Sequence, residues 1–180
     1  MLLGLWLAAG DVCGAEMPAA LPPSLEYKVK AAYLFNFAKY VEWPARAFPG
    51  EDAPIVIGIL GQVPFDSVME ETIAGRQIGK RRVVVRRSKR AEDLRDAHVL
   101  FIGVSERERL TRILTVLKGR SVLTVSEMPR FCLNGGMVAF VLEREVVRFD
   151  VNLDNAEQAG LKISARMLAT ARVVQPRKRS

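Results

Sequence analysis

Few residues in this sequence have side chains suited to catalysis. Histidine occurs once, as His98, and cysteine occurs twice, as Cys13 and Cys132. Zinc sites usually need three or four His or Cys ligands, and most acid–base catalysis relies on a histidine. His98 opens an apolar run and is interpreted as a structural histidine, while Cys132, between two apolar residues, is typical of a small buried side chain. The sequence therefore predicts no catalytic residue and no metal site.

Motifs that bind phosphates or activate nucleophiles are also absent. No predicted strand is followed by G-x-G-x-x-G or by G-x-x-x-x-G-K-[ST], and G-x-S-x-G does not occur. Gly58 and Gly61 flank the end of a predicted strand, where close packing or a turn is their expected role. The carboxylates of Glu70, Glu71, Glu143 and Glu145 are expected to be solvated. The sequence therefore predicts no cofactor, and an enzyme would lack a recognisable set of catalytic groups.

The chain is basic, with 27 Lys and Arg against 20 Asp and Glu and a formal charge of +7. Basic residues gather at 80–90 and at 177–179. Aromatic residues are not interleaved with them, and this argues against nucleic acid as a partner. A solvated strand rim is the simplest interpretation of the first cluster, and attraction to an acidic protein surface or to an anionic membrane face is the alternative.

The N-terminus has the layout of a secretory signal peptide over residues 1–15. The apolar run Leu2–Ala9 is far shorter than the roughly 20 residues of a membrane-spanning helix, and small residues follow it up to an expected cut after Ala15. The positive opening region is missing, which suggests that the peptide is truncated at its start. Alternatives are a buried N-terminal helix or a lipid anchor on Cys13. After the cut, Cys132 has no partner for an intramolecular disulfide, and we expect a periplasmic chain without membrane insertion.

The rest of the chain alternates between strands and helices and is long enough for one domain. Its composition, 49% hydrophobic and 26% charged, excludes disorder. We expect an extended lead-in over 16–24, a single domain over 25–174 and a basic tail over 175–180. Strands are predicted at 54–60, 82–87, 98–104, 121–125, 137–142 and 146–152, and helical segments at 25–42, 64–74, 91–96, 106–118, 126–133, 154–157 and 164–173. This order predicts an α/β fold, a three-layer domain with a central mixed sheet ending in an antiparallel hairpin.

The first predicted helix has more apolar surface than a surface helix needs. On a helical wheel one apolar stripe contains Tyr27, Ala31, Leu34, Ala38 and Val41, and a second contains Val29, Tyr33, Phe37 and Tyr40. Either the helix is buried nearly all round, or one stripe faces a partner. The candidate partner or dimer interface therefore consists of Tyr33, Leu34, Phe37, Tyr40, Val41 and Trp43.

The same helix carries a resemblance to a known family. KAAYLFNFAKYVEWP, residues 30–44, resembles the opening signature of the YfiR-like family of periplasmic regulators. The resemblance extends from about Tyr27 to Val173 and continues through residues 57–61, 64–65, 98–103, 123–126, 135–137, 148–152 and 159–164. It implies a non-catalytic, dimeric periplasmic protein that binds and represses the periplasmic sensor domain of a membrane-bound diguanylate cyclase, lowering cyclic di-GMP and biofilm formation.

The sequence departs from this family at its cysteines. Relatives are regulated partly by cysteine pairing, but Ala97 stands where they often have a cysteine and Cys132 has no evident mate. The alternative function is that of a periplasmic small-molecule-binding protein. Its pocket is expected at the carboxyl ends of the central strands, near Gly61, Val104 and Ser126.

Overall fold

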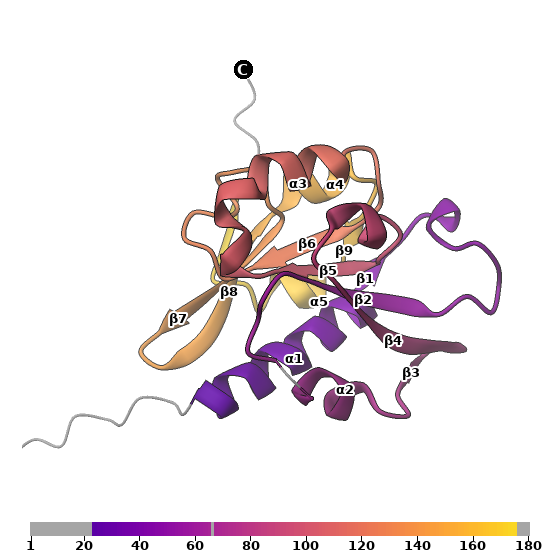
Figure 1. Ribbon diagram of the computed structural model, residues 1–180, viewed down its shortest axis with the longest axis horizontal. Helices are drawn as coiled ribbons and strands as arrows, with labels where there is room; N and C mark the ends of the chain where they lie inside the picture. Colours follow the sequence, from indigo (N-terminus) through magenta and orange to yellow (C-terminus); the bar gives the residue numbers. More distant parts are fainter. Residues whose placement is uncertain (1–22, 66, 176–180) are drawn as a thin grey trace, which may run out of the picture.

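A mixed β-sheet forms the middle layer of the protein in a computed structural model, which describes residues 23–65 and 67–175 (Figure 1). The predicted signal peptide, most of the lead-in and the last five residues of the tail lie outside the described residues. The sheet has eight strands in the order β10-β8-β7-β6-β5-β2-β4-β3. Their bounds are β2 Ile55–Leu60, β3 Gln77–Ile78, β4 Arg81–Ser88, β5 Val99–Ile102, β6 Leu123–Ser126, β7 Val138–Glu143, β8 Val146–Asn152 and β10 Val173–Gln175.

The central strands β4, β2, β5, β6 and β7 are parallel, and β8 runs antiparallel to β7. Every residue of β2, β5 and β6 is buried, which explains their nearly continuous apolar sequences. The hairpin turn between β7 and β8 consists of Arg144 and Glu145, both with positive φ, as a tight two-residue connection requires. The predicted α/β fold with a mixed sheet and an antiparallel hairpin is thus confirmed.

Helices cover both faces of the sheet and create two separate cores. On one face lie α1 (Pro23–Tyr40), α2 (Val68–Ile73) and α5 (Ala165–Leu168), over a core that includes Phe37, Phe101 and Phe149. On the other lie the 3-10 helices η2 (Ala91–Leu94) and η3 (Val104–Arg109) and the helix α3 (Leu110–Val116), over a core that includes Leu100 and Phe131. The helix α4 (Leu153–Gln158) follows β8.

The first helix starts and ends earlier than the sequence predicted, at Pro23 and Tyr40 instead of at 25 and 42. It begins at Pro23, a residue compatible with a first turn, and ends at Tyr40. Val41–Glu42 forms β1, which pairs antiparallel with β9 (Lys162–Ile163), and η1 (Ala45–Ala47) follows. This two-stranded sheet fastens the end of α1 to a segment near the C-terminus.

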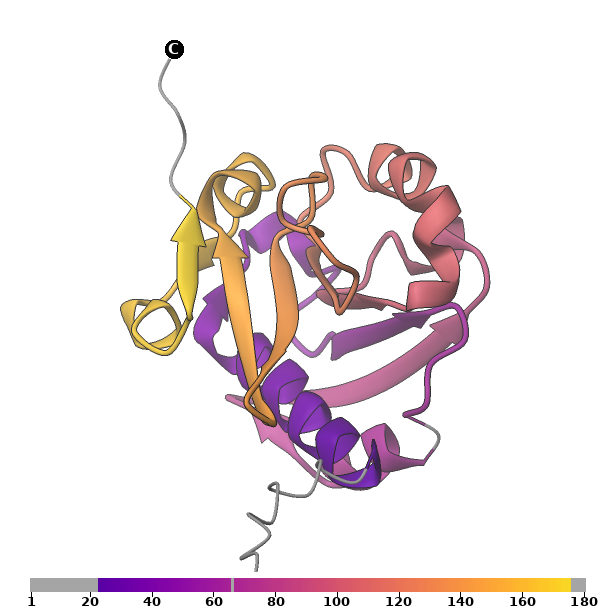
Figure 2. The same cartoon turned by 90° about the vertical axis from the view of Figure 1, so that its left-hand side faces the viewer.

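Other local predictions also differ from the structure. The predicted helix over 106–118 begins as η3 and becomes α-helical only at Leu110. Just before it, the Ser105 hydroxyl accepts from the Gln62 N–H, 3.0 Å away. The segment 126–133 is not a helix: Ser126 ends β6, and the residues after it form a bend and turns. Beyond α5, β10 adds a parallel strand next to β8, so the hairpin does not form the sheet edge (Figure 2). Gln175, expected in the tail, belongs to this strand.

Candidate functional site

The six residues of the predicted interface divide into a buried set and a half-exposed set. Leu34, Phe37 and Val41 are 0%, 1% and 5% exposed and belong to the core beneath α1. Tyr33, Tyr40 and Trp43 are half-buried and pack against the edge of that core. In this fold, only the second set offers side-chain surface to another protein.

The half-exposed aromatic residues have different surroundings. The ring of Tyr33 stacks on Phe37 at 5.8 Å between centroids and meets the edge of Phe149 at 5.4 Å, so it joins α1 to the hairpin. Two cations lie near the ring of Tyr40, with Lys39 Nζ at 5.6 Å and the Arg166 guanidinium at 5.7 Å from its centroid. Tyr40 is therefore a partly exposed aromatic residue in a positively charged environment.

A buried ion cluster that the sequence did not predict holds the first half of α1. Lys30 is 4% exposed, and its ammonium group contacts the carboxylates of Glu26 and Glu127. The Tyr27 hydroxyl donates to Glu127 at 3.0 Å, and burial together with the charge of Glu127 raises the Tyr27 pKa. Glu127 directly follows β6, so the cluster ties α1 to the carboxyl end of the sheet. Local patterning gave no signal for it, because Lys30 and Glu127 lie far apart in the chain.

At the predicted ligand pocket, the chain's own atoms occupy the space beside Gly61, and the Ser126 hydroxyl is already hydrogen-bonded. A Cβ at Gly61, which has a φ of +86°, would lie 2.6 Å from Ser105 Oγ and 2.7 Å from Glu106 Cγ. The Ser126 hydroxyl is fully buried and donates to the Ile102 carbonyl at 2.7 Å. Val104 is 40% exposed at the start of η3. The three residues lie at the predicted edge, and protein side chains fill the space next to Gly61.

His98 lies in an apolar environment at the amino-terminal edge of the sheet. It is 2% exposed, its Nδ1 accepts from the Val56 N–H at 3.1 Å, and its ring stacks on Phe48 at 4.5 Å. Burial, with a smaller contribution from the charge of Arg81, lowers its pKa to about 4. Because Nδ1 accepts a hydrogen bond, the neutral ring carries its proton on Nε2. These contacts describe a structural histidine.

Cys132 is buried in the core on the face of the sheet opposite α1. It is 4% exposed, and its Sγ is 3.6 Å from the Met137 carbonyl. Burial, followed by the charge of Asp150, raises the pKa of its thiol to about 12, so the reactive thiolate is disfavoured. Within residues 23–65 and 67–175, no three His, Cys, Asp or Glu side chains are grouped so as to hold a metal ion.

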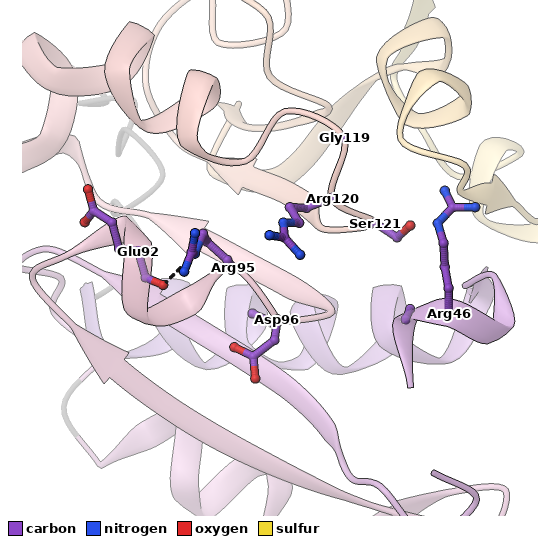
Figure 3. A pocket seen from close by; sticks show the side chains of 9 residues that line it. Arg46, Glu92, Arg95, Asp96, Gly119, Arg120 and Ser121 are labelled. Carbon is purple, nitrogen blue, oxygen red and sulfur yellow. Dashed lines mark hydrogen bonds between the residues drawn. The ribbon is translucent and has the colours of Figure 1, made fainter. Parts of the chain in front are cut away.

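Two cavities meet at the loop between α3 and β6. One, of about 540 Å³, lies next to α3 and α4 and has apolar walls at Leu114, Leu117 and Met137. The other, of about 320 Å³, lies at the amino-terminal edge of β5 and β6 and has a polar lining with three arginines (Figure 3). Both include Gly119 and Arg120. The sequence predicted a pocket at the opposite edge of the sheet.

The basic cluster at 80–90 is partly neutralised within the fold. Arg86 pairs with Asp96 at 2.7 Å, Arg87 pairs with Glu70 at 2.9 Å, and the Arg81 guanidinium donates to the carbonyls of Gly50 and Ala53. Burial would raise the pKa of Asp96, but the hydrogen bond and charge of Arg86 outweigh it and lower that pKa. Arg81, Arg86 and Arg87 of β4 are therefore already engaged in contacts within the domain.

Comparison with known proteins identifies the family to which this protein belongs. The YfiR/HmsC-like family matches residues 27–172, and the chain belongs to this family. Its members are periplasmic, non-catalytic regulators associated with diguanylate cyclases and cyclic di-GMP signalling. Among the described helices, none is sufficiently long and apolar to cross a membrane.

The fold is similar to that of a solved structure. A conserved domain protein from Vibrio cholerae is similar with a TM-score of 0.59 and 9% identity, over 87% of this chain and 62% of the Vibrio chain. The present chain therefore spans less than two thirds of that relative. An ABC domain from Streptococcus pneumoniae, solved in complex with L-Trp, matches 67% of this chain and 55% of its own at 10% identity and a TM-score of 0.49.

Proposed function

We propose that this protein is a periplasmic regulator without catalytic activity that binds the periplasmic sensor domain of an inner-membrane diguanylate cyclase and represses it. Repression would lower cyclic di-GMP and biofilm formation. The family match over residues 27–172 supports the regulatory role. The repressor needs to bind the inactive arrangement of its partner more tightly than the active one, because a ligand shifts an equilibrium only by its difference in affinity.

The observation that carries the binding role is a half-exposed stripe along α1, defined as Leu25, Val29, Tyr33 and Tyr40. Leu25 is 44% exposed, and the other three are partly buried against the core. Leu142 of β7, which is 51% exposed, lies on the same face of the sheet as Phe140, and the Tyr33 ring is 5.9 Å from Phe140. Aromatic and aliphatic groups of this kind form the centres of protein interfaces. We assign this surface to the cyclase, or to a second copy of the chain in a homodimer.

The test combines gene deletion with two charge-introducing variants. Deletion is expected to raise cyclic di-GMP and surface attachment, and wild-type protein is expected to restore both. Tyr40→Asp is expected to fold, to lose co-purification with the co-encoded membrane cyclase and to fail in restoring repression. Leu133→Asp is the matched control, because Leu133 is 61% exposed in the turns that follow β6. Unchanged cyclic di-GMP after deletion, in cells that express the cyclase, would overturn the proposal.

The second candidate, a periplasmic small-molecule-binding protein, is favoured by the cavity of about 540 Å³ next to α3 and α4. Its apolar walls and its polar groups at Thr111, Asn134 and Gln158 are typical of small-ligand sites. This function predicts that deletion leaves cyclic di-GMP unchanged while a periplasmic metabolite raises the melting temperature of the purified protein.

A further inference from the structure

The cavity at the amino-terminal edge of β5 and β6 is built from three segments that are distant in sequence. The first segment is η1, the second is η2 with the connection to β5, and the third is the loop that leads into β6. They contribute Arg46 and Ala47, then Glu92, Arg95, Asp96 and Ala97, and finally Gly119, Arg120 and Ser121. Figure 3 shows these side chains around one hollow, with Ser121 between Arg120 and Arg46 in this view. The cavity measures about 320 Å³, which suits a small molecule.

Three arginines of the lining lack a carboxylate partner. Among the described residues, Arg46, Arg95 and Arg120 form no ion pair, and the guanidinium of Arg95 donates only to the backbone carbonyl of Glu92, at 3.1 Å. Three cations around one hollow repel one another. An anion bound between the three guanidinium groups would attract each of them and offset their mutual repulsion.

The acidic residues of the lining are already paired with arginines that do not line the cavity. Asp96 accepts from Arg86 at 2.7 Å, and Glu92 lies 3.9 Å from both Arg90 and Arg112. The carboxylates therefore have counter-charges elsewhere. The three lining arginines remain available for a ligand.

A buried hydroxyl in the wall adds a neutral donor. Ser121 Oγ is shielded from solvent and has no hydrogen-bond partner among the described residues. Ser121 is also one of the residues that line the cavity, next to Arg120. A serine hydroxyl can donate to the oxygen of a carboxylate or phosphate.

We propose that this cavity binds a small organic polyanion with at least two carboxylate or phosphate groups. Guanidinium groups bind both kinds of oxyanion through paired N–H donors, and three of them around a small space favour a ligand with more than one charge. The ligand site lies at the edge of the sheet opposite the predicted pocket at Gly61, Val104 and Ser126. The proposal does not depend on the cyclase partner.

The test measures binding on the purified chain with two probes, citrate for carboxylates and pyrophosphate for phosphates. At constant ionic strength, set with sodium chloride, one or both probes are expected to raise the melting temperature saturably. The probe that binds more tightly, measured by calorimetry, identifies the anionic group. The absence of a saturable effect with either probe would overturn the proposal.

Variants separate the cavity from the general positive charge of the protein. The double variant Arg46→Gln/Arg120→Gln is expected to fold and to lose at least tenfold in affinity. The control, Arg107→Gln/Arg148→Gln, changes net charge equally at two exposed arginines outside the cavity and is expected to bind like wild type. Equal loss in both double variants would contradict a defined site. Ser121→Ala, which keeps all three arginines, is expected to weaken binding about two- to tenfold.

Discussion

His98 is neutral in the folded protein and is expected to make stability depend on pH. The unfolded chain takes up a proton near the ordinary histidine pKa of about 6.5, whereas burial lowers the folded pKa to about 4. The contribution of the neutral ring to the free energy of unfolding is therefore complete above about pH 6.5. It is lost as the pH falls towards about 4, by about 3 kcal/mol in total.

His98→Gln is expected to lack this part of the pH dependence, because glutamine does not titrate and its side-chain oxygen can accept from the Val56 N–H. Urea unfolding at pH 7 and at pH 4.5 measures the difference between wild type and variant. The same loss of stability in both proteins would show that His98 does not titrate on unfolding. The variant is expected to retain repression, since His98 touches no partner surface.

At the scale of elements, different interactions hold the two ends of α1: strand pairing holds its last turn, and ion pairs hold its first half. Its last turn is fastened through β1 and β9, and its first half is fastened by the ion cluster of Lys30, Glu26 and Glu127. Between them, Leu34 and Phe37 are fully buried. The half-exposed stripe is therefore carried by a helix that the domain holds firmly, which favours a preformed binding surface over one that orders on binding.

Removal of the Lys30 charge tests how much the cluster stabilises α1. Lys30→Met leaves Glu26 and Glu127 close together without a cation, and the free energy of unfolding is expected to fall by about 2–3 kcal/mol. Lys28→Met is the matched control on the exposed side of the helix, with an expected change below about 0.5 kcal/mol. Denaturant titration gives both values. Addition of Glu127→Gln to Lys30→Met is expected to restore part of the loss, and a further loss instead would contradict this role of the cluster.

An element could be predicted from the sequence where neighbouring residues determine it, and could not where contacts between distant residues determine it. The strands β2, β5 and β6 were predictable because a parallel strand buried on both faces is a continuous apolar run. The excess apolar surface of α1 was visible in the sequence, but its division into buried and half-exposed residues depends on contacts with Phe140 and Phe149. The strand β1 and the burial of Lys30 depend on partners far along the chain, and no local pattern indicates them. The arginine-lined cavity was missed for the same reason, since its three segments meet only in the fold.

At the scale of the whole molecule, the two faces of the sheet have separate cores, and Cys132 belongs to the one beneath α3. Its thiol is buried, and its pKa is raised to about 12. We therefore expect its reaction with a thiol reagent to require unfolding, with a rate at least a hundredfold lower in buffer than in denaturant. The dependence of this rate on denaturant concentration reports the opening of that core. Rapid labelling in buffer, or a dimer sensitive to dithiothreitol, would show that the thiol is accessible and would restore a redox role.

The pairing of β1 with β9 has a consequence for the order in which the protein can fold during synthesis. The two strands come from opposite ends of the domain, and two aromatic residues of α1, Tyr33 and Phe37, pack on β7 and β8, which also lie in the second half of the chain. A chain made only as far as β6 therefore has α1 without part of its packing surface, and Tyr33 and Phe37 lack their aromatic partners on β7 and β8. Such an unfinished chain exposes an aromatic helix to aggregation or to chaperones until its last third has been synthesised.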